Sequence, residues 1–192
     1  MAALQSVGLV HLQVGLVGAL VVGVLTALYY FFKNSQQSNK GVLDQTEQAG
    51  LSLWTAAEEG RVYDLALLCQ EWKGNVAVLN WTNIEWENST PLMTACAWDK
   101  LEAVKILVRT PGVDLNKAGK TGWTALFLAA VNGYVEIVKV LLAEEGIELN
   151  KAPTGGVYEC HTPLMIATAN PFRREQCSLV VDLLKARGAD KN

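Results

Sequence analysis

A short motif recurs three times between residues 90 and 165, and its spacing limits what the chain can fold into. The copies are Thr90-Pro-Leu-Met, Thr124-Ala-Leu-Phe and Thr162-Pro-Leu-Met, which begin 34 and 38 residues apart. An alanine follows each copy at the same offset, at Ala95, Ala129 and Ala167. A repeat of this length predicts an array of stacked structural units, each of which contacts only its neighbours.

The residues of one unit predict a pair of helices. Thr124 is a good N-cap, because its hydroxyl can accept a hydrogen bond from an early helical amide. In the other two copies Pro follows Thr and suits the first helical position, where no amide partner is needed. Gly133 allows the turn to the second helix, which is predicted over Val135–Ala143. That helix carries one apolar stripe, made by Ile137, Val138, Leu141 and Leu142.

A second signature, Leu-Asn, marks the segments between units. Leu79-Asn80, Leu115-Asn116 and Leu149-Asn150 are expected in extended hairpins that lead to the next unit. The third unit carries about four extra residues between its helices, around residues 170–175. The last helix pair has no following repeat, so either its free side is polar or something covers it.

These units resemble ankyrin repeats, which have a period of about 33 residues and a Thr-Pro-Leu-His-x-Ala motif. Met93, Phe127 and Met165 replace the histidine of that motif and remove a hydrogen-bonding side chain from each unit. An earlier unit, residues 53–60, aligns with residues 126–133, lacks Thr-Pro and resembles an N-terminal capping repeat. The resemblance implies an all-α solenoid over residues 51–192, with a capping repeat over about 51–85 and repeats over about 86–118, 119–152 and 153–192.

The resemblance also implies where a partner binds. Ankyrin domains bind proteins with their hairpin tips and the concave face of their first helices, and Trp and Tyr are enriched at interface hot spots. The residues predicted for partner binding are Trp86, Glu87, Trp98, Lys120, Trp123, Asn132, Tyr158 and His161. Alternatively, some of these rings pack against neighbouring hairpins. Trp54 and Trp81 are expected to be packing residues of the capping repeat.

Residues 7–32 contain no Asp, Glu, Lys or Arg. About 20 apolar residues cross a bilayer core roughly 30 Å thick, so a single transmembrane helix is predicted after a short tail, residues 1–6. A cleaved signal peptide is disfavoured, because no basic residue precedes the run and the run is too long. Lys33 and Lys40 follow it and begin a polar linker over residues 33–50. Their charge predicts that the ankyrin domain lies on the cytoplasmic-type side, in cytosol, matrix or stroma.

Small residues recur at every fourth position within this segment. Gly15, Ala19, Gly23 and Ala27 lie on one helix face, where small residues let another transmembrane helix approach closely. The alternative is that Gly and Ala are simply common in membrane helices. His11 either ligates a haem or chlorophyll metal or lies near enough to the membrane surface to reach headgroups and water.

The remaining composition disfavours catalysis and nucleic-acid binding. The formal net charge is −3, which gives no basic surface for nucleic acid. The four cysteines lack Cys-x-x-Cys spacing, and no phosphate-binding loop or catalytic set is present, so neither an enzyme, a cofactor, a metal nor a small-molecule substrate is expected. The predicted function is an accessory, structural or assembly subunit of a membrane complex, for example an energy-transducing complex of chloroplast or mitochondrion. The alternative is a membrane-tethered adaptor or regulatory scaffold that transiently recruits a soluble partner.

Overall fold

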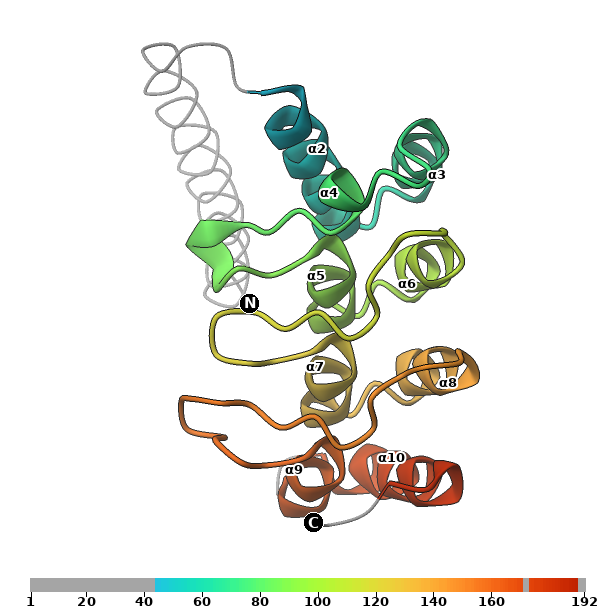
Figure 1. The fold of residues 1–192 in the computed structure, drawn as a ribbon. Helices are drawn as coiled ribbons and strands as arrows, with labels where there is room; N and C mark the ends of the chain where they lie inside the picture. The colour runs from blue at the N-terminus through green and yellow to red at the C-terminus, as the bar shows by residue number, and fades with distance from the viewer. Residues whose placement is uncertain (1–43, 171–172, 190–192) are drawn as a thin grey trace, which may run out of the picture. The chain divides into compact units, whose positions relative to one another are not determined.

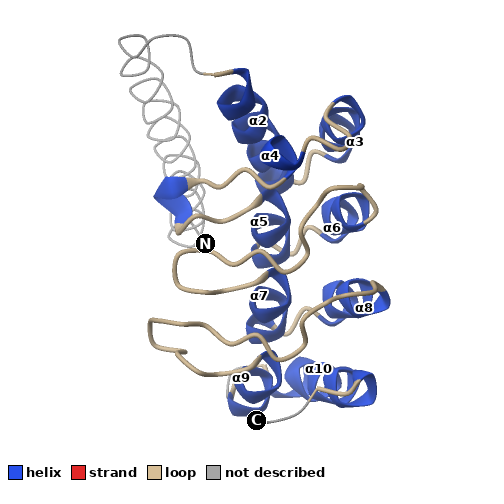
Figure 2. Ribbon diagram, viewed as in Figure 1, coloured by secondary structure: helices blue, strands red, loops and turns tan. Residues whose placement is uncertain are grey.

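The computed structural model describes residues 44–170 and 173–189, and every regular element within them is helical (Figures 1 and 2). In chain order the elements are α2 (Gln45–Glu59), α3 (Val62–Glu71), α4 (Val76–Leu79), the 3-10 helix η1 (Ile84–Trp86), α5 (Pro91–Ala97), α6 (Leu101–Val108), α7 (Ala125–Asn132), α8 (Val135–Ala143), α9 (Pro163–Ala169) and α10 (Arg174–Arg187). The prediction of an all-helical solenoid is therefore confirmed for this part of the chain.

The helices form two parallel columns (Figure 1). One column holds the first helix of each unit, α2, α5, α7 and α9, and each of these contacts the next. The other column holds the second helices, α3, α6, α8 and α10, which also contact one another in order. The longer loops between units project from the same side of the first column (Figure 2).

Threonine caps start the first helices of the three motif-bearing units. The hydroxyls of Thr90, Thr124 and Thr162 accept hydrogen bonds of 3.2, 3.2 and 3.3 Å from the amides three residues later. Gly133 adopts φ +68 where α7 turns into α8, and α8 has the predicted bounds. The cap and turn predictions are confirmed.

The core lies between the two columns. Its largest fully buried side chains include Phe127, Leu126, Leu92 and Leu53, and the repeated alanines of the motif are buried as well. Stacking of four units therefore removes from water the apolar faces that a single helix pair would expose.

The first unit begins earlier than the predicted boundary at residue 51. Helix α2 starts at Gln45, so residues 45–50 belong to a helix and not to the linker. Residues 45–48 of this helix are polar, whereas Ala49 and Gly50 are buried. Gly50 faces Trp81 so closely that a Cβ atom added to it would overlap the indole ring. Gly50, which falls within the predicted linker, is thus a packing residue of the first unit.

Helix α10 has a polar outer surface. Most of the extra residues in the third unit lengthen this helix, which has 14 residues compared with nine in α8. It buries Cys177, Val180 and Leu184. The residues on its exposed side are mainly polar or charged and include Arg174, Glu175, Gln176, Asp182, Lys185 and Arg187. Helix α10 therefore presents a mainly polar outer surface at this end of the described stack.

The predicted transmembrane segment, residues 7–32, lies outside the described residues, together with His11 and the proposed docking positions Gly15, Ala19, Gly23 and Ala27. The same holds for residues 33–43 of the predicted linker. None of the helices within residues 44–170 and 173–189 combines the length and the apolar character required to cross a bilayer.

Candidate partner-binding groove

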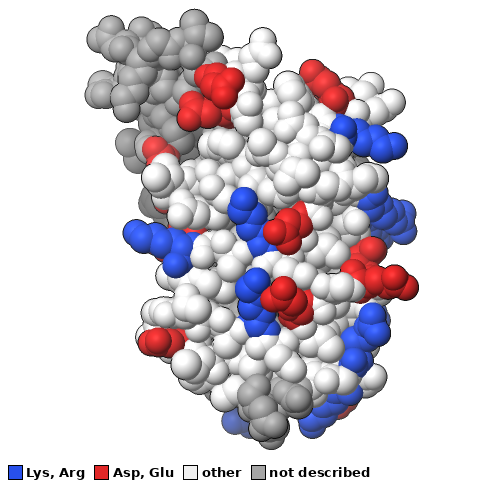
Figure 3. Space-filling view, in the orientation of Figure 1, with Lys and Arg blue, Asp and Glu red and all other residues white. Residues whose placement is uncertain are grey.

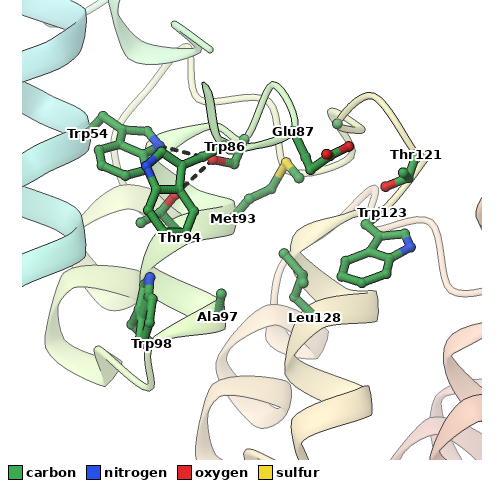
Figure 4. A pocket seen from close by; sticks show the side chains of 12 residues that line it. Trp54, Trp86, Glu87, Met93, Thr94, Ala97, Trp98, Thr121, Trp123 and Leu128 are labelled. Carbon is green, nitrogen blue, oxygen red and sulfur yellow. Dashed lines mark hydrogen bonds between the residues drawn. The ribbon is translucent and has the colours of Figure 1, made fainter. Parts of the chain in front are cut away.

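A groove opens between the projecting loops and the first helices α2, α5 and α7 (Figure 4). It encloses about 230 Å³. Four tryptophans line it, and we call it the tryptophan groove: they are Trp54, Trp86, Trp98 and Trp123. The apolar remainder comes from Met93, Ala97, Leu128 and Gly119, and the polar lining residues are Glu87, Ser89, Thr94 and Thr121.

Trp54 of α2 forms a fixed back wall. Its side chain is 3% exposed, and its ring centroid lies 6.2 Å from that of Trp86 with a 34° angle between the planes. The indole N–H donates a 3.1 Å hydrogen bond to Ser89 Oγ, which also accepts a 3.2 Å bond from Thr94 Oγ1 (Figure 4). Trp54 is therefore a packing residue, as predicted, and it also contributes to the groove.

The loop that carries Trp86 is closed by its own hydrogen bonds. The amide of Asn83 donates to the Ser89 carbonyl, and the amide of Ser89 donates to the Trp86 carbonyl. Glu87 and Asn88 both adopt left-handed backbone, with φ of +54 and +55. This conformation costs about 1–2 kcal/mol for Glu87, whereas asparagine adopts it more readily. Even so, the loop leaves Trp86 49% exposed.

Trp98 stands at the C-terminal end of α5 and is 52% exposed. Figure 4 shows it on the same side of the groove as Trp54 and Trp86, with Ala97 and Leu128 between it and Trp123. Two half-exposed indoles therefore border one apolar hollow. Large aromatic rings in such a position offer extensive contact area at little cost in conformational entropy.

Trp123 is supported by a second aromatic cluster. Its ring centroid lies 5.7 Å from that of Phe127 and 6.0 Å from that of Tyr158. Tyr158 also contacts His161, with the ring centroids 6.4 Å apart. Within the described residues, the buried Trp123 Nε1 has no hydrogen-bond partner. The far wall of the groove is thus fixed by tilted, packed rings from α7, from the loop before it and from the loop between α8 and α9.

The structure brings together half of the residues predicted for partner binding. Trp86, Glu87, Trp98 and Trp123 line the tryptophan groove. The other four do not line it: they are Lys120, Asn132, Tyr158 and His161. Tyr158 and His161 instead pack within the second aromatic cluster, which is the alternative considered for these rings. The Asn132 side-chain amide donates to the Leu128 carbonyl at 2.9 Å, and Lys120 is exposed beside the groove.

Sequence reasoning missed several lining residues. Met93, Leu128 and Thr94 belong to the first helices and read as ordinary core positions, although each also borders the groove. The position of Met93 gives the one signal available, because it replaces the motif histidine of the resembling family. An unbranched, adaptable side chain at that position suits a binding surface.

Charges on the described surface are mixed in sign, and three of the four cysteines are buried. On the face in Figure 3, lysine and arginine side chains are interspersed with aspartate and glutamate, and neither sign gathers into one patch. All four cysteines are free. Burial raises the pKa of the Cys69, Cys96 and Cys177 thiols, so these groups resist forming the thiolate that acts as nucleophile.

Comparison with known proteins identifies the repeat. A family model described as Ankyrin repeats (3 copies) matches residues 53–153 and, in a second alignment, residues 112–192. Together the two matches extend over most of the chain and include all four units of the fold. A comparison with curated protein sequences gives no match.

Proposed function

The chain belongs to the ankyrin-repeat family, and on that premise we propose that it is an accessory, structural or assembly subunit of a multi-subunit membrane complex. Ankyrin repeats are protein–protein interaction modules and in general are not enzymes. In this proposal, residues 7–32 anchor the chain, and the ankyrin domain lies on the cytoplasmic-type side of the membrane. The tryptophan groove holds a neighbouring protein.

One observation carries the proposal for partner binding: Trp86 and Trp98 are each about half exposed at the edge of an open apolar hollow. Exposed indoles next to Met93, Ala97 and Leu128 leave apolar area in contact with water that a partner would cover. Burial of apolar area stabilises a complex by roughly 25 cal/mol per Å² before the costs of association. The strained loop that holds Trp86 is consistent with a functional surface.

The membrane half of the proposal rests on the sequence. Residues 7–32 have the length and the absence of charge that a bilayer-spanning helix requires. Their small-residue face supplies a second docking surface, toward another transmembrane helix. Two separate contact surfaces on one small chain favour a constitutive subunit over an adaptor that binds its partner transiently.

We expect Trp98→Ala to reduce partner retention by at least tenfold, because truncating a hot-spot tryptophan typically costs 2 kcal/mol or more. The full-length chain is extracted with a mild detergent and captured, and the proteins that remain with it after a high-salt wash are quantified by mass spectrometry. Tyr63→Ala is the matched control, because Tyr63 is an exposed aromatic on α3, outside the groove.

Equal retention by the Trp98→Ala and Tyr63→Ala variants would remove the groove from the proposal. Loss of all partners of the unsubstituted chain in high salt would instead favour the transient adaptor.

The proposed transmembrane anchor, residues 7–32, is tested separately. The full chain should stay in the membrane pellet after alkaline carbonate extraction, as a transmembrane protein does. The double variant Gly15→Leu, Gly23→Leu should also stay in the membrane, but it should migrate on a native gel without the rest of the complex, because leucine blocks close helix approach. Release of the unsubstituted chain into the carbonate supernatant contradicts the anchor, and unchanged assembly of the double variant contradicts the docking face.

A further inference from the structure

We propose that the tryptophan groove receives the side chain of an arginine presented by the partner protein. This inference rests on the proposed function and adds the chemistry of the partner. Three features of the groove lead to it: the one charged side chain among its described lining residues, its two half-exposed tryptophans, and the hydrogen-bond acceptors at its edge.

The charge of the groove is negative. Glu87 is the one charged residue among the described residues that line it, and its side chain is exposed. Some carboxylates in the described chain pair with basic side chains, as Glu102 does with Lys105 and Glu136 with Lys139. No such ion pair is formed by Glu87 within the described residues. A cation bound here would therefore meet a carboxylate that is not already neutralised.

The tryptophans also favour a positively charged ligand. The face of an indole ring is electron-rich, and it attracts a cation placed within about 6 Å of its centroid. Trp86 and Trp98 are half exposed around the hollow, while Trp54 closes the space behind Trp86. Among the described residues, no lysine, arginine or histidine lines the groove to repel a cation. Lys120 is nearby in the next loop, but its side chain is exposed to solvent outside the lining.

Arginine fits these features better than lysine. Its guanidinium is planar and weakly hydrated, so it can stack on an indole, whereas the lysine ammonium is strongly hydrated. The five N–H donors of the guanidinium lie in its plane. They can therefore donate hydrogen bonds to a carboxylate while the face of the guanidinium stacks on an indole. Figure 4 shows Glu87 and Thr121 at the same edge of the groove, and Met93 lies between that edge and Trp86. The aliphatic stem of arginine would cover Met93 and Ala97.

The test compares arginine with its neutral analogue. The full chain in an uncharged detergent is titrated with acetyl-Gly-Arg-Gly-amide, and with the same peptide containing citrulline or lysine, while the indole N–H signals are followed by NMR. We expect the arginine peptide to bind about tenfold or more tightly than the citrulline peptide, and more tightly than the lysine peptide. Equal affinity for arginine and citrulline, or saturation by neither, would overturn the inference.

Substitutions in this protein test where the arginine side chain binds. Glu87→Gln should lower the affinity for the arginine peptide several-fold, and Trp98→Ala should lower it further. Glu159→Gln is the matched control, since Glu159 is an exposed loop carboxylate that does not line the groove. If Glu159→Gln weakens binding as much as Glu87→Gln, the attraction comes from the overall charge, and the groove is not the site.

Three further results bear on this inference, and the last two separate it from the proposed function. If choline binds more tightly than the arginine peptide, the groove is a quaternary-ammonium site and the arginine assignment fails. If Trp98→Ala releases the partner proteins but no arginine peptide binds, the proposed function stands and this inference fails. If the arginine peptide binds but no partner depends on Trp98, the inference stands and the subunit role fails.

Discussion

The Phe127→Ala variant is expected to lose about 3–5 kcal/mol of unfolding free energy. Phe127 is 0% exposed in α7, at the centre of the stack, and it contacts both Trp123 and Tyr158. Removing its ring leaves a cavity between two units whose interface stabilises both. Since folded domains are stable by only about 5–15 kcal/mol, the variant would be close to unfolding.

The chain supplies its own control for this substitution. Methionine occupies the equivalent position in two neighbouring units, at Met93 and Met165. Phe127→Met keeps most of the volume and should cost below about 2 kcal/mol. Both variants are compared with the unsubstituted chain by urea unfolding in a mild detergent, followed by circular dichroism. If Phe127→Ala costs no more than Phe127→Met, the aromatic cluster is not an important part of the stack.

The helix pairs were predictable because local signals and the repeat agree. Threonine caps start α5, α7 and α9, and Gly133 ends α7, so the starts of all three helices and the end of α7 follow from single residues. The start of α2 could not be predicted in this way. Its first turn is polar, and Gly50 is buried only because Trp81 packs on it from 31 residues further along the chain.

The groove was predictable where the repeat fixes the geometry. Trp86, Trp98 and Trp123 occupy positions that follow from their offsets to the motif, and all three line the groove. Tyr158 depends instead on the conformation of its long loop, which the Cys160 amide closes with a 3.1 Å hydrogen bond to the Pro153 carbonyl. That closure accompanies packing of Tyr158 against Trp123, and no pattern of spacing could indicate it.

The role of the Leu-Asn signature also appears only in the structure. The side-chain amide of Asn80 donates to the carbonyls of Val76 and Gly112, at 3.0 and 2.7 Å. Its oxygen accepts a hydrogen bond from the amide of Asp114. Asn116 repeats the last two bonds one unit later, to the Gly146 carbonyl and from the Glu148 amide. The signature asparagine therefore joins successive units.

Asn80→Ala should lower the free energy of unfolding by about 2–4 kcal/mol, because it leaves backbone groups of Gly112 and Asp114 without partners in a partly buried site. Asn80 itself is 5% exposed. Asn116→Ala removes the equivalent inter-unit bonds, but these are solvent-exposed, and water can replace them. We expect that variant to lose below about 1.5 kcal/mol. Urea unfolding of the two variants side by side measures the difference.

The pair of asparagine variants separates two explanations for stability in this stack. If the bonds matter because they are shielded from water, only Asn80→Ala is strongly destabilising. If they matter because they fix the spacing of successive units, both variants lose similar free energy and both unfold with a lower dependence on urea, since uncoupled units unfold separately. Burial differs between the sites while the two inter-unit bonds are the same, so we expect the first outcome. Equal losses would show that inter-unit geometry, and not shielding, holds the units together.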